Sequence, residues 1–368
     1  MLKDYPFEQL VQPLLEWYPA HARVLPWRED PAPYRVWVSE IMLQQTRVEA
    51  VRPYFERFMQ ALPDIASLAA CPQERLLKLW EGLGYYNRVR NMQTAARTVM
   101  EQYGGELPPD YEALLKLKGI GRYTAGAIAS IAYGIPVPAV DGNVLRILMR
   151  VSEDDGDILK QSVKTEAEKV LQPVIPKEQA GMFTQAAMEL GATVCVPNGE
   201  PKCSECPWQP YCLACRHQSY ADLPKKGKAK PRKIEERTVL VIRDGEKVLL
   251  HRRPPKGLLA GMYEFPNLEG HLTREEVTQY VESMQMLPLK VDPLEDARHI
   301  FSHIEWQMKG YMIRVAELEE LAGKDEGYVF AKAEVSEEKY AIPSAFARYT
   351  RYMNIHTGIR KEQKNKNG

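Results

Sequence analysis

The segment 117–141, "LKGIGRYTAGAIASIAYGIPVPAVD", decides the fold of the first half of the chain. Gly119 and Gly121 form a turn in which the backbone can take positive dihedral angles and stays uncovered by side chains. The run after the turn is rich in small residues, so a helix there can pack closely against a neighbour. Two helices joined in this way leave free amides at the start of the second helix, and such amides bind phosphate. The segment predicts a phosphate-binding hairpin, with an ordinary interhelical turn as the alternative.

Around this segment the chain has a helical pattern up to about residue 190. Apolar residues recur at intervals of three and four, which is the period of an amphipathic helix. Glycine and proline separate the periodic stretches. We therefore expect an all-helical first domain over residues 1–215. The stretches are "FEQLVQPLLEWY" (7–18), "YRVWVSEIMLQQT" (34–46), "VRPYFERFMQAL" (51–62), "RVRNMQTAARTVMEQYGG" (88–105) and "MFTQAAMELGATVC" (182–195).

The composition changes after residue 215. A basic, proline-marked stretch, "LPKKGKAKPRK" (223–233), predicts an exposed linker over residues 216–235. Strand-like runs surround Asp244 and Gly245, a pair typical of hairpin turns. We expect an α+β domain over residues 236–355 and a disordered tail over 356–368. Its predicted strands are "RTVLVIRD" (237–244), "KVLLHRR" (247–253), "GMYEFPN" (261–267), "HIEWQMKGYMIRV" (303–315) and "GYVFAK" (327–332), and its predicted helices are "TREEVTQYVESM" (273–284) and "SAFARYTRYM" (344–353).

The overall composition is that of a globular protein. The chain has 368 residues, of which 45% are hydrophobic, and this length suits two domains with cores of their own. No apolar run reaches the ~18 residues that a membrane-spanning helix needs. The first residues lack the layout of a signal peptide. We expect a cytoplasmic protein without a membrane partner.

Four of the six cysteines form one cluster with the spacing Cys195-x7-Cys203-x2-Cys206-x5-Cys212, and Cys215 follows. In a chain without secretory features such a cluster is more typical of a metal site than of disulfides. Four thiolates can hold either a tetrahedral zinc ion or an iron–sulfur cluster, and the spacing alone leaves both open.

Two carboxylates stand out by their surroundings. Asp141 precedes a helical run, where an aspartate is also a good helix N-cap. Glu40 lies in an otherwise apolar helix, either on a solvated stripe or in a pocket that raises its pKa. Cleavage of a glycosidic bond needs one protonated and one ionised carboxylate. The pair therefore suits release of a purine base through an oxocarbenium-like sugar.

Together these motifs resemble the adenine DNA glycosylases (MutY type) of the helix-hairpin-helix superfamily. The resemblance rests on "LPWR" (25–28), "VSEIMLQQTRV" (38–48), "WEGLGYYNRVRN" (80–91), "LKGIGRYTAGAI" (117–128), "AVDGNVLR" (139–146) and the cysteine cluster. It implies a six-helix barrel with an iron–sulfur module that holds one [4Fe–4S] cluster through Cys195, Cys203, Cys206 and Cys212. The first cysteine interval here is seven residues where the family has six. The implied substrate is double-stranded DNA with adenine opposite 8-oxoguanine or guanine, bound by a monomer.

The resemblance also implies residue roles. Glu40 would protonate the flipped adenine. Asp141 would stabilise the oxocarbenium ion or trap it covalently before water attacks, with Tyr123 and Asn143 holding and polarising that aspartate. Related endonucleases carry a lysine where this chain has Tyr123, and a tyrosine cannot form their Schiff base. The chain is therefore expected to be a monofunctional glycosylase. The remaining implied contacts are Arg28 and Gln185 with adenine; Gln45, Thr46, Leu83 and Tyr85 with the opened duplex; and Gly119, Gly121 and Arg122 with the DNA backbone.

The second domain resembles a Nudix fold at "GLLAGMYEFPN" (257–267). The glutamates of a catalytic Nudix box do not follow, so metal-dependent hydrolysis is not expected there. The resemblance instead implies a domain that reads 8-oxoguanine through Phe301, Ser302 and His303. As a bare tripeptide, "FSH" is equally an ordinary strand edge.

Charge is the main argument against DNA binding. Residues 1–215 hold slightly more Asp and Glu than Lys and Arg. We expect a divided surface, on which the acidic "SEDDGD" (152–157) and Glu166/Glu168 region faces away from DNA. The DNA face would carry Arg47, Arg88, Arg90, Lys118, Arg122 and the 223–233 linker. Three alternatives stay open: a bifunctional endonuclease III-like glycosylase and lyase, a non-catalytic iron–sulfur DNA-binding protein, and a Nudix nucleotide hydrolase.

Overall fold

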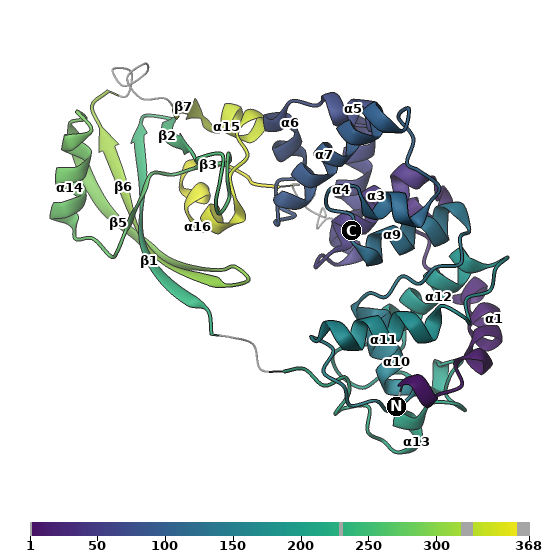
Figure 1. The fold of residues 1–368 in the computed structure, drawn as a ribbon. Helices are drawn as coiled ribbons and strands as arrows, with labels where there is room; N and C mark the ends of the chain where they lie inside the picture. Colours follow the sequence, from purple (N-terminus) through teal and green to yellow (C-terminus); the bar gives the residue numbers. More distant parts are fainter. Residues whose placement is uncertain (1, 228–230, 318–326, 359–368) are drawn as a thin grey trace, which may run out of the picture. The chain divides into compact units, whose positions relative to one another are not determined.

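The computed structural model describes residues 2–227, 231–317 and 327–358 (Figure 1). Its contacts divide the chain into two compact units, one of Met1–Ala70 with Asn91–Ala229 and one of Cys71–Arg90 with Lys230–Gly368. Most of the predicted tail, residues 359–368, lies outside the described part. No helix within the described ranges is long and apolar enough to cross a membrane.

The first unit is helical, as the 3.6-residue pattern predicts. Within residues 2–227 the structure describes helices and turns and no strand. One of its cores packs α1 and α10 against α12, with buried leucines from all three helices. Helix α6 and the start of α7 belong to the second unit, although they lie within this part of the sequence. The helices up to residue 216 are α1 (Val11–His21), α2 (Pro26–Glu29), α3 (Pro33–Leu43), α4 (Val48–Ala61), α5 (Ile65–Ala70), α6 (Gln73–Leu79), α7 (Asn87–Gln102), α8 (Tyr111–Leu115), α9 (Arg122–Ala127), α10 (Gly142–Val151), α11 (Gln161–Leu171), α12 (Ala180–Thr193) and α13 (Leu213–Arg216). Short 3-10 turns are η1 (Leu2–Asp4), η2 (Phe7–Leu10) and η4 (Cys203–Glu205), and η3 (Ile128–Ala132) is a π-helix that continues α9.

The predicted hairpin is the α8–turn–α9 segment, and its two glycines have different reasons to be glycine. Gly119 has a φ of +81°, and a Cβ there would lie 2.6 Å from the Cβ of Asn91. Gly121 has a φ of −93°, which any residue adopts, so the expectation of a positive angle is wrong at this position. A Cβ on Gly121 would meet nothing within 4 Å. The fold therefore requires glycine at 119 but not at 121.

The small residues of α9 allow the close approach that the sequence predicts. A Cβ on Gly126 would collide with the backbone carbonyl of Pro138. The chain that leads to Asp141 therefore passes directly against α9. This contact brings the aspartate to the same region as Tyr123.

The second unit is an α+β structure with a seven-stranded sheet. The hydrogen-bonded order is β3-β2-β1-β6-β5, with β4 paired to β1 and β7 paired to β2, and only β1 and β6 are parallel among the described pairs. The predicted hairpin at Asp244 is present, since Asp244 pairs with Lys247. The strands are β1 (Lys233–Asp244), β2 (Lys247–Arg252), β3 (Tyr263–Glu264), β4 (Asn267–Glu269), β5 (Pro288–Ile300), β6 (Ile304–Val315) and β7 (Tyr328–Lys332).

Both faces of this sheet are covered (Figure 1). Along β1, Val239 and Val241 point to one core, whereas Leu240 and Ile242 point to the other, as the two-residue period of a strand requires. Helix α14 (Arg274–Ser283) lies on the second core. The first core is closed by η6 (Ser344–Phe346), α16 (Ala347–Thr350) and η7 (Arg351–Met353), and α15 (Ala333–Lys339) follows β7.

A buried carboxylate holds the segment 71–90 within the second unit. Glu81 is 2% exposed. Its Oε1 accepts a hydrogen bond from the amide of Ile342 at 2.7 Å, and its Oε2 accepts one from the amide of Gly358 at 3.0 Å. Lys78 forms an ion pair with the same carboxylate at 2.8 Å and donates to the carbonyl of Tyr340. Contacts remote in sequence thus fix this segment.

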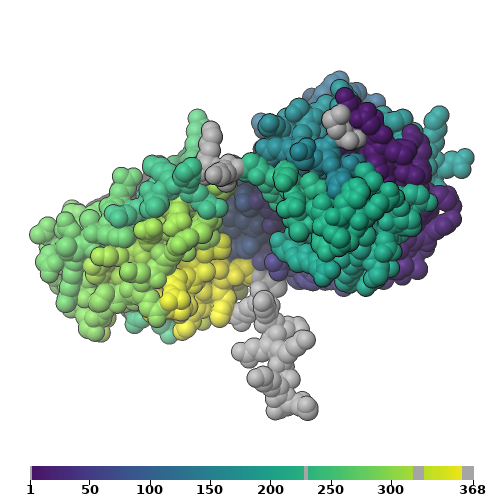
Figure 2. All heavy atoms as spheres, turned by 90° about the horizontal axis from the view of Figure 1, so that it is seen from below, coloured from purple at the N-terminus to yellow at the C-terminus, as the bar shows by residue number. Residues whose placement is uncertain are grey.

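The predicted linker is bonded to the first unit over its first half. Leu223 is buried, and its carbonyl accepts from Arg150 at 2.9 Å. The carbonyl of Lys225 accepts from the amide of Ile158 at 3.1 Å. Figure 2 shows this teal-to-green stretch within the continuous surface of the first unit. Residues 228–230 lie outside the described part, and the domain boundaries predicted from the sequence stay a prediction.

Candidate active site

A cavity of about 920 Å³ lies within the first unit. Its walls come from α2, α3 and the turn after it, the start of α9, the start of α10, and α12. The cavity gathers residues that are far apart in the sequence. Those that the sequence predicts for the base and the reaction are Arg28, Glu40, Gln45, Thr46, Tyr123, Asp141, Asn143 and Gln185.

Glu40 lies in this pocket rather than on a solvated stripe. It is 5% exposed on α3, and the hydroxyl of Tyr123 donates a hydrogen bond to its Oε2. The pKa of Glu40 is raised to about 7, mainly by burial; the Tyr123 hydrogen bond and the charge of Arg28 act to lower it, and the nearby Asp141 acts to raise it. The carboxyl can therefore carry a proton near neutral pH.

Asp141 is both a helix N-cap and a pocket residue. Its Oδ1 accepts from the amide of Val144 at 2.7 Å, and its Oδ2 accepts from Nδ2 of Asn143 at 2.9 Å. Burial raises the pKa of Asp141, but these hydrogen bonds and the positive charge of Arg146 act in the opposite direction. Donors aimed at both oxygens favour the ionised form.

Arg146 fixes the amide that faces Asp141. Its Nη2 donates to Oδ1 of Asn143 at 2.8 Å and to the carbonyl of Gly191 at 2.6 Å. Because Oδ1 of Asn143 is occupied, the NH₂ group of that amide is the end that faces the aspartate. A Cβ at Gly191 would lie 2.7 Å from the Cβ of Asn143, so glycine permits this approach of α10 and α12.

Tyr123 contacts Glu40, whereas the resemblance implies a contact with Asp141. Its hydroxyl donates to Glu40, while Asn143 alone of the two donates to Asp141. Burial and the charges of both carboxylates raise the pKa of Tyr123 well above its usual value. The tyrosine therefore stays a neutral donor. Among the lining residues that the structure describes, Lys164 on α11 is the one lysine.

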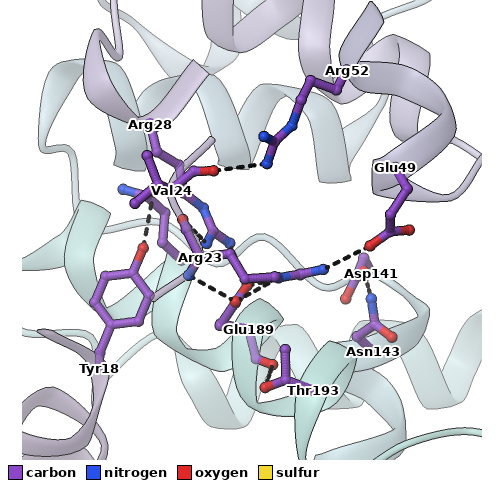
Figure 3. Close-up of polar contacts among 11 residues, drawn as sticks. Tyr18, Arg23, Val24, Arg28, Glu49, Arg52, Asp141, Asn143, Glu189 and Thr193 are labelled. Atoms are coloured by element: carbon purple, nitrogen blue, oxygen red, sulfur yellow. Dashed lines mark hydrogen bonds and ion pairs between the residues drawn. The ribbon is translucent and has the colours of Figure 1, made fainter. Parts of the chain in front are cut away.

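A buried ion-pair cluster in the same pocket was not predicted (Figure 3). Glu189 on α12 is 0% exposed and pairs with Arg23 and Arg28, each at 2.7 Å. Burial raises the pKa of Glu189, but the hydrogen bonds from Arg23 and Arg28 outweigh it, so the net pKa is lowered. A signal was available in the sequence: a glutamate inside the apolar stretch "MFTQAAMELGATVC", four residues after Gln185.

The loop predicted to enter the duplex belongs to the second unit and is described apart from the pocket. Tyr85 is 50% exposed with a φ of +48°, whereas Leu83 is buried. Arg88 donates to the carbonyls of Leu83 and Gly84 at 3.2 Å, and its guanidinium lies 5.5 Å from the ring centroids of Trp80 and Tyr85. Burial lowers the pKa of Arg88 to about 10. Arg88, which was expected on the DNA face, thus holds the shape of its own loop, and its contact with DNA stays a prediction.

The "FSH" tripeptide forms the tip of the hairpin between β5 and β6. The amide of Phe301 bonds the carbonyl of Ile304 at 2.8 Å. The ring of Phe301 packs against Trp306, with centroids 5.0 Å apart, so this residue anchors the tip in the core. Ser302 and His303 are exposed, and the hydroxyl of Ser302 lies 3.2 Å from Nδ1 of His303.

At the hairpin of the first unit, Arg122 is half exposed and forms an ion pair with Glu168. The expected division of the surface does not hold at Glu168, which was placed on the face away from DNA but pairs with Arg122 from the expected DNA face. This acidic side chain, carried by α11, thus lies beside the predicted phosphate contact.

Comparisons with known proteins match the helical part and the sheet-containing part of the chain to two different families. Residues 38–173 match the HhH-GPD superfamily of base excision DNA repair proteins, and residues 238–352 match the NUDIX domain. Adenine DNA glycosylase of Mus musculus is 37% identical over 360 residues, which cover 82% of this chain and 69% of the mouse protein. The chain belongs to the adenine DNA glycosylases. It is a DNA glycosylase of base excision repair, an enzyme that acts on DNA.

Other relatives of this glycosylase agree. Adenine DNA glycosylase of Buchnera aphidicola from Schizaphis graminum is 33% identical, with 81% of this chain and 85% of the relative covered. The solved structure of a thermostable thymine-DNA glycosylase has a TM-score of 0.52 at 25% identity and covers 57% of this chain and 96% of its own. The helical glycosylase fold followed by a Nudix-like domain is thus confirmed.

The cysteines of this glycosylase surround one small hollow of about 30 Å³. All four predicted ligands line it, and Cys215 lines it too. The guanidinium of Arg150 donates to Sγ of Cys195 at 3.3 Å, which places positive charge beside the thiols. Within the described ranges no three ligating side chains are drawn together around a single-ion position. The donor set, five thiols about one hollow of which four are the predicted ligands, fits a cluster with thiolate ligands.

Proposed function

We propose that this glycosylase hydrolyses the N-glycosidic bond of adenine mispaired with 8-oxoguanine, or with guanine, in double-stranded DNA. The observation that carries the proposal is the contrast between Glu40 and Asp141 in one pocket. One carboxyl has a pKa of about 7 and a single hydroxyl donor, and the other accepts N–H bonds on both oxygens. This contrast is what cleavage of a glycosidic bond requires.

In the proposed reaction the protonated carboxyl of Glu40 gives its proton to a ring nitrogen of the everted adenine. The bond between the sugar carbon and the base then breaks, and its electron pair leaves with the base. Asp141, as an anion, stabilises the oxocarbenium ion at the sugar. A water molecule adds to that carbon and loses a proton, so the products are adenine and an abasic site.

The other pocket residues have positioning roles in this proposal. Arg28 and Gln185 hold the adenine, and Gln45 and Thr46 contact the strand where the base has left the stack. Tyr85, being exposed, supplies a stacking face, and Leu83 serves as a wedge that has to leave its buried position. Ser302 and His303 contact 8-oxoguanine, with Phe301 holding their loop.

The DNA backbone is proposed to bind at the α8–α9 hairpin. The open space beside Gly121 allows a phosphate to approach the amides at the start of α9, and Arg122 adds positive charge. Gly119 contributes by shaping the turn. We propose that a monomer performs these functions.

We propose further that Cys195, Cys203, Cys206 and Cys212 hold one [4Fe–4S] cluster with a structural role. Hydrolysis of a glycosidic bond transfers no electrons, so the cluster would serve the fold of its loop. A brown protein with absorption near 410 nm (roughly the region of such clusters) and about four irons per chain is expected. Stoichiometric zinc without iron would contradict this.

The test of the function is single-turnover base release. Duplexes with adenine opposite 8-oxoguanine, guanine or thymine are mixed with excess enzyme, and adenine release is followed with time. We expect release from the first two and a loss of about 100-fold or more in Glu40→Gln and in Asp141→Asn. Glu56→Gln, an exposed carboxylate on α4, is the matched control. Equal rates in all variants would refute the assignment.

The absence of lyase activity is a separate prediction. Because Tyr123 offers no amine, the abasic strand should stay intact until it is treated with alkali. Strand scission without alkali, at the rate of base release, would contradict monofunctional chemistry. Any slow scission is assigned by Lys164→Gln, since Lys164 lines the pocket.

A further inference from the structure

Glu189 has all of its hydrogen-bonding capacity committed to two arginines (Figure 3). Its Oε1 accepts from the amide of Arg23 at 3.1 Å and from Nε of the same residue at 2.7 Å. Its Oε2 accepts from Nη2 of Arg23 at 2.9 Å and from Nη2 of Arg28 at 2.7 Å. Four charged or backbone donors thus converge on one carboxylate that has no exposure to solvent.

The cluster has few ways to rearrange. Nη1 of Arg28 donates to the carbonyl of Arg23 at 3.3 Å, so the arginines are joined to each other as well as to Glu189. The guanidinium of Arg28 lies 5.9 Å from the ring centroid of Tyr18. The carbonyl of Val24 is held by Arg52 at 2.9 Å. Without the buried anion, two cations would face each other on the pocket wall, and the exposed Glu49, 3.8 Å from Nη1 of Arg23, would be the remaining ion-pair partner among the described residues.

The position of Arg28 bears on the reaction. Arg28 lines the pocket, its charge influences Glu40, and Gln185 lies one helical turn before Glu189 on α12. A helix places residues four apart on one face. One rigid helix therefore carries both the proposed base contact at 185 and the anion that holds the other base contact.

We infer that Glu189 is a positioning residue for base release, which fixes the guanidinium of Arg28 against the departing adenine. This inference rests on the proposed function. Glu189 itself contacts Arg23 and Arg28 and does not have to touch the substrate. A carboxylate that merely stabilised the fold would affect folding and leave the chemistry of the folded enzyme unchanged.

A double-mutant cycle tests the inference. Single-turnover adenine release is measured for Glu189→Gln, Arg28→Gln and the double variant on the 8-oxoguanine duplex. We expect each single variant to lose about 30-fold or more in rate, because a misplaced guanidinium misaligns the base. The double variant should be no slower than Arg28→Gln, since residues that act through one another are not additive. A loss in the double variant equal to the product of the two single losses would overturn the inference.

Two further readouts separate positioning from general damage. The dissociation constant for the duplex should change by less than about threefold in Glu189→Gln, because the phosphate contacts remain. Glu189→Asp retains the charge and should recover part of the rate, whereas a site that needs only volume should favour Gln, which has the size of Glu, over the shorter Asp. Glu49→Gln is the matched control: Glu49 is exposed and lies 3.8 Å from Arg23, so its removal should change the rate by less than about threefold.

The pH profile gives an independent check. The groups that face Glu40 are Tyr123 from α9, Asp141 from the start of α10 and Arg28 from α2. Without Glu189, the charge of Arg28 is uncompensated and favours the ionised form of Glu40. The alkaline fall in rate should therefore move to lower pH in Glu189→Gln, whereas a packing defect would lower the rate equally at every pH.

Each outcome decides a different statement. If the wild-type enzyme releases no adenine from any duplex, the proposed function fails. If the wild-type enzyme is active and Glu189→Gln keeps its rate, the inference alone fails. If Glu189→Gln does not fold, as judged by its melting temperature, Glu189→Asp and its double variant with Arg28→Gln decide the same cycle.

Discussion

At the scale of single residues, the two pocket carboxylates differ in their donors more than in their burial. Glu40 is buried and Asp141 half-buried, and burial raises the pKa of each. Asp141 caps α10 and accepts N–H bonds on both oxygens, whereas Glu40 receives a single hydroxyl from Tyr123. The helix start therefore supplies the difference in protonation on which the proposed chemistry depends.

The first prediction concerns the pH dependence of base release. The acid must be protonated, and burial raises the pKa of Glu40 to about 7. The single-turnover rate should therefore be nearly flat around pH 6 and fall about tenfold per pH unit above pH 8. Stopped-time assays between pH 5.5 and 9 check this. A rate that continues to rise through pH 9 would show that no acid of this kind takes part.

A second prediction concerns stability. The pKa of Glu40 rises from 4.5 in the unfolded chain to about 7 in the folded one. The folded chain then binds more protons between these values, so stability is lost as the pH rises through that window. Glu40→Gln removes this loss and should be more stable than wild type at pH 8, by on the order of 1–3 kcal/mol. Urea unfolding at pH 5 and pH 8 measures it, and the gain should shrink at pH 5.

At the scale of elements, the α8–α9 hairpin shows how a pair of glycines divides two tasks. The fold requires glycine at position 119, because its φ is +81° and Asn91 occupies the space that a side chain would need. Gly121 has ordinary dihedral angles and open space around it. Since the fold does not require glycine at position 121, the missing side chain is better explained by a ligand that approaches the backbone there.

The third prediction uses this pair. Gly119→Ala should lower the free energy of unfolding by about 1–3 kcal/mol, because the new Cβ is both strained and in collision. Gly121→Ala should melt like wild type but bind duplex DNA several-fold more weakly. Thermal melts and DNA titrations on both variants check this. A Gly121→Ala variant with unchanged affinity would remove the hairpin from the list of backbone contacts.

The sequence predicts helices and strands well where a single hydrophobic period dominates the stretch. Helices α3, α4, α7 and α12 and strands β1, β2 and β6 lie where their patterns place them. Strand β5 was missed, because its two prolines and its charges hide the pattern, and it lies at an edge of the sheet.

The site was predicted less evenly. The motifs bring Glu40 and Asp141 to one pocket, but partners set by tertiary packing leave little signal in the sequence. Glu189 was missed although it lies in a predicted helix, and Arg88 was assigned to DNA although it binds the carbonyls of its own loop. Which donor faces which carboxylate depends on the close approach at Gly126 and Gly191, which a linear pattern does not encode.

At the scale of the whole molecule, the formal net charge is zero, with 49 basic and 49 acidic residues. A protein that binds DNA without excess positive charge has to place its cations locally. Three of the basic residues expected on the DNA face are already engaged: Arg88 with its loop, Arg90 with the carbonyl of Ala260, and Arg122 with Glu168. Binding therefore depends on fewer free cations than the sequence suggests.

The fourth prediction follows from this arrangement. DNA affinity should fall with salt, since phosphate contacts release counterions, but with a slope that corresponds to few contacts. Between 50 and 200 mM salt, enzymes with six to ten contacts lose about 10³–10⁵ in affinity, and we expect a smaller loss here. Glu168→Gln should steepen the slope, because it frees Arg122. Fluorescence anisotropy titrations measure both, and a slope unaffected by Glu168→Gln would exclude Arg122 from the interface.

The carboxylate of Glu81 has a consequence for anyone who divides the protein at its linker. A polypeptide that starts near residue 230 contains the amides of Ile342 and Gly358 but lacks the acceptor that both require. The C-terminal half without residues 71–90 is therefore an incomplete unit, and produced by itself it should be prone to aggregation. A single proteolytic nick near residue 229 should instead yield two polypeptides that co-purify until denaturant separates them.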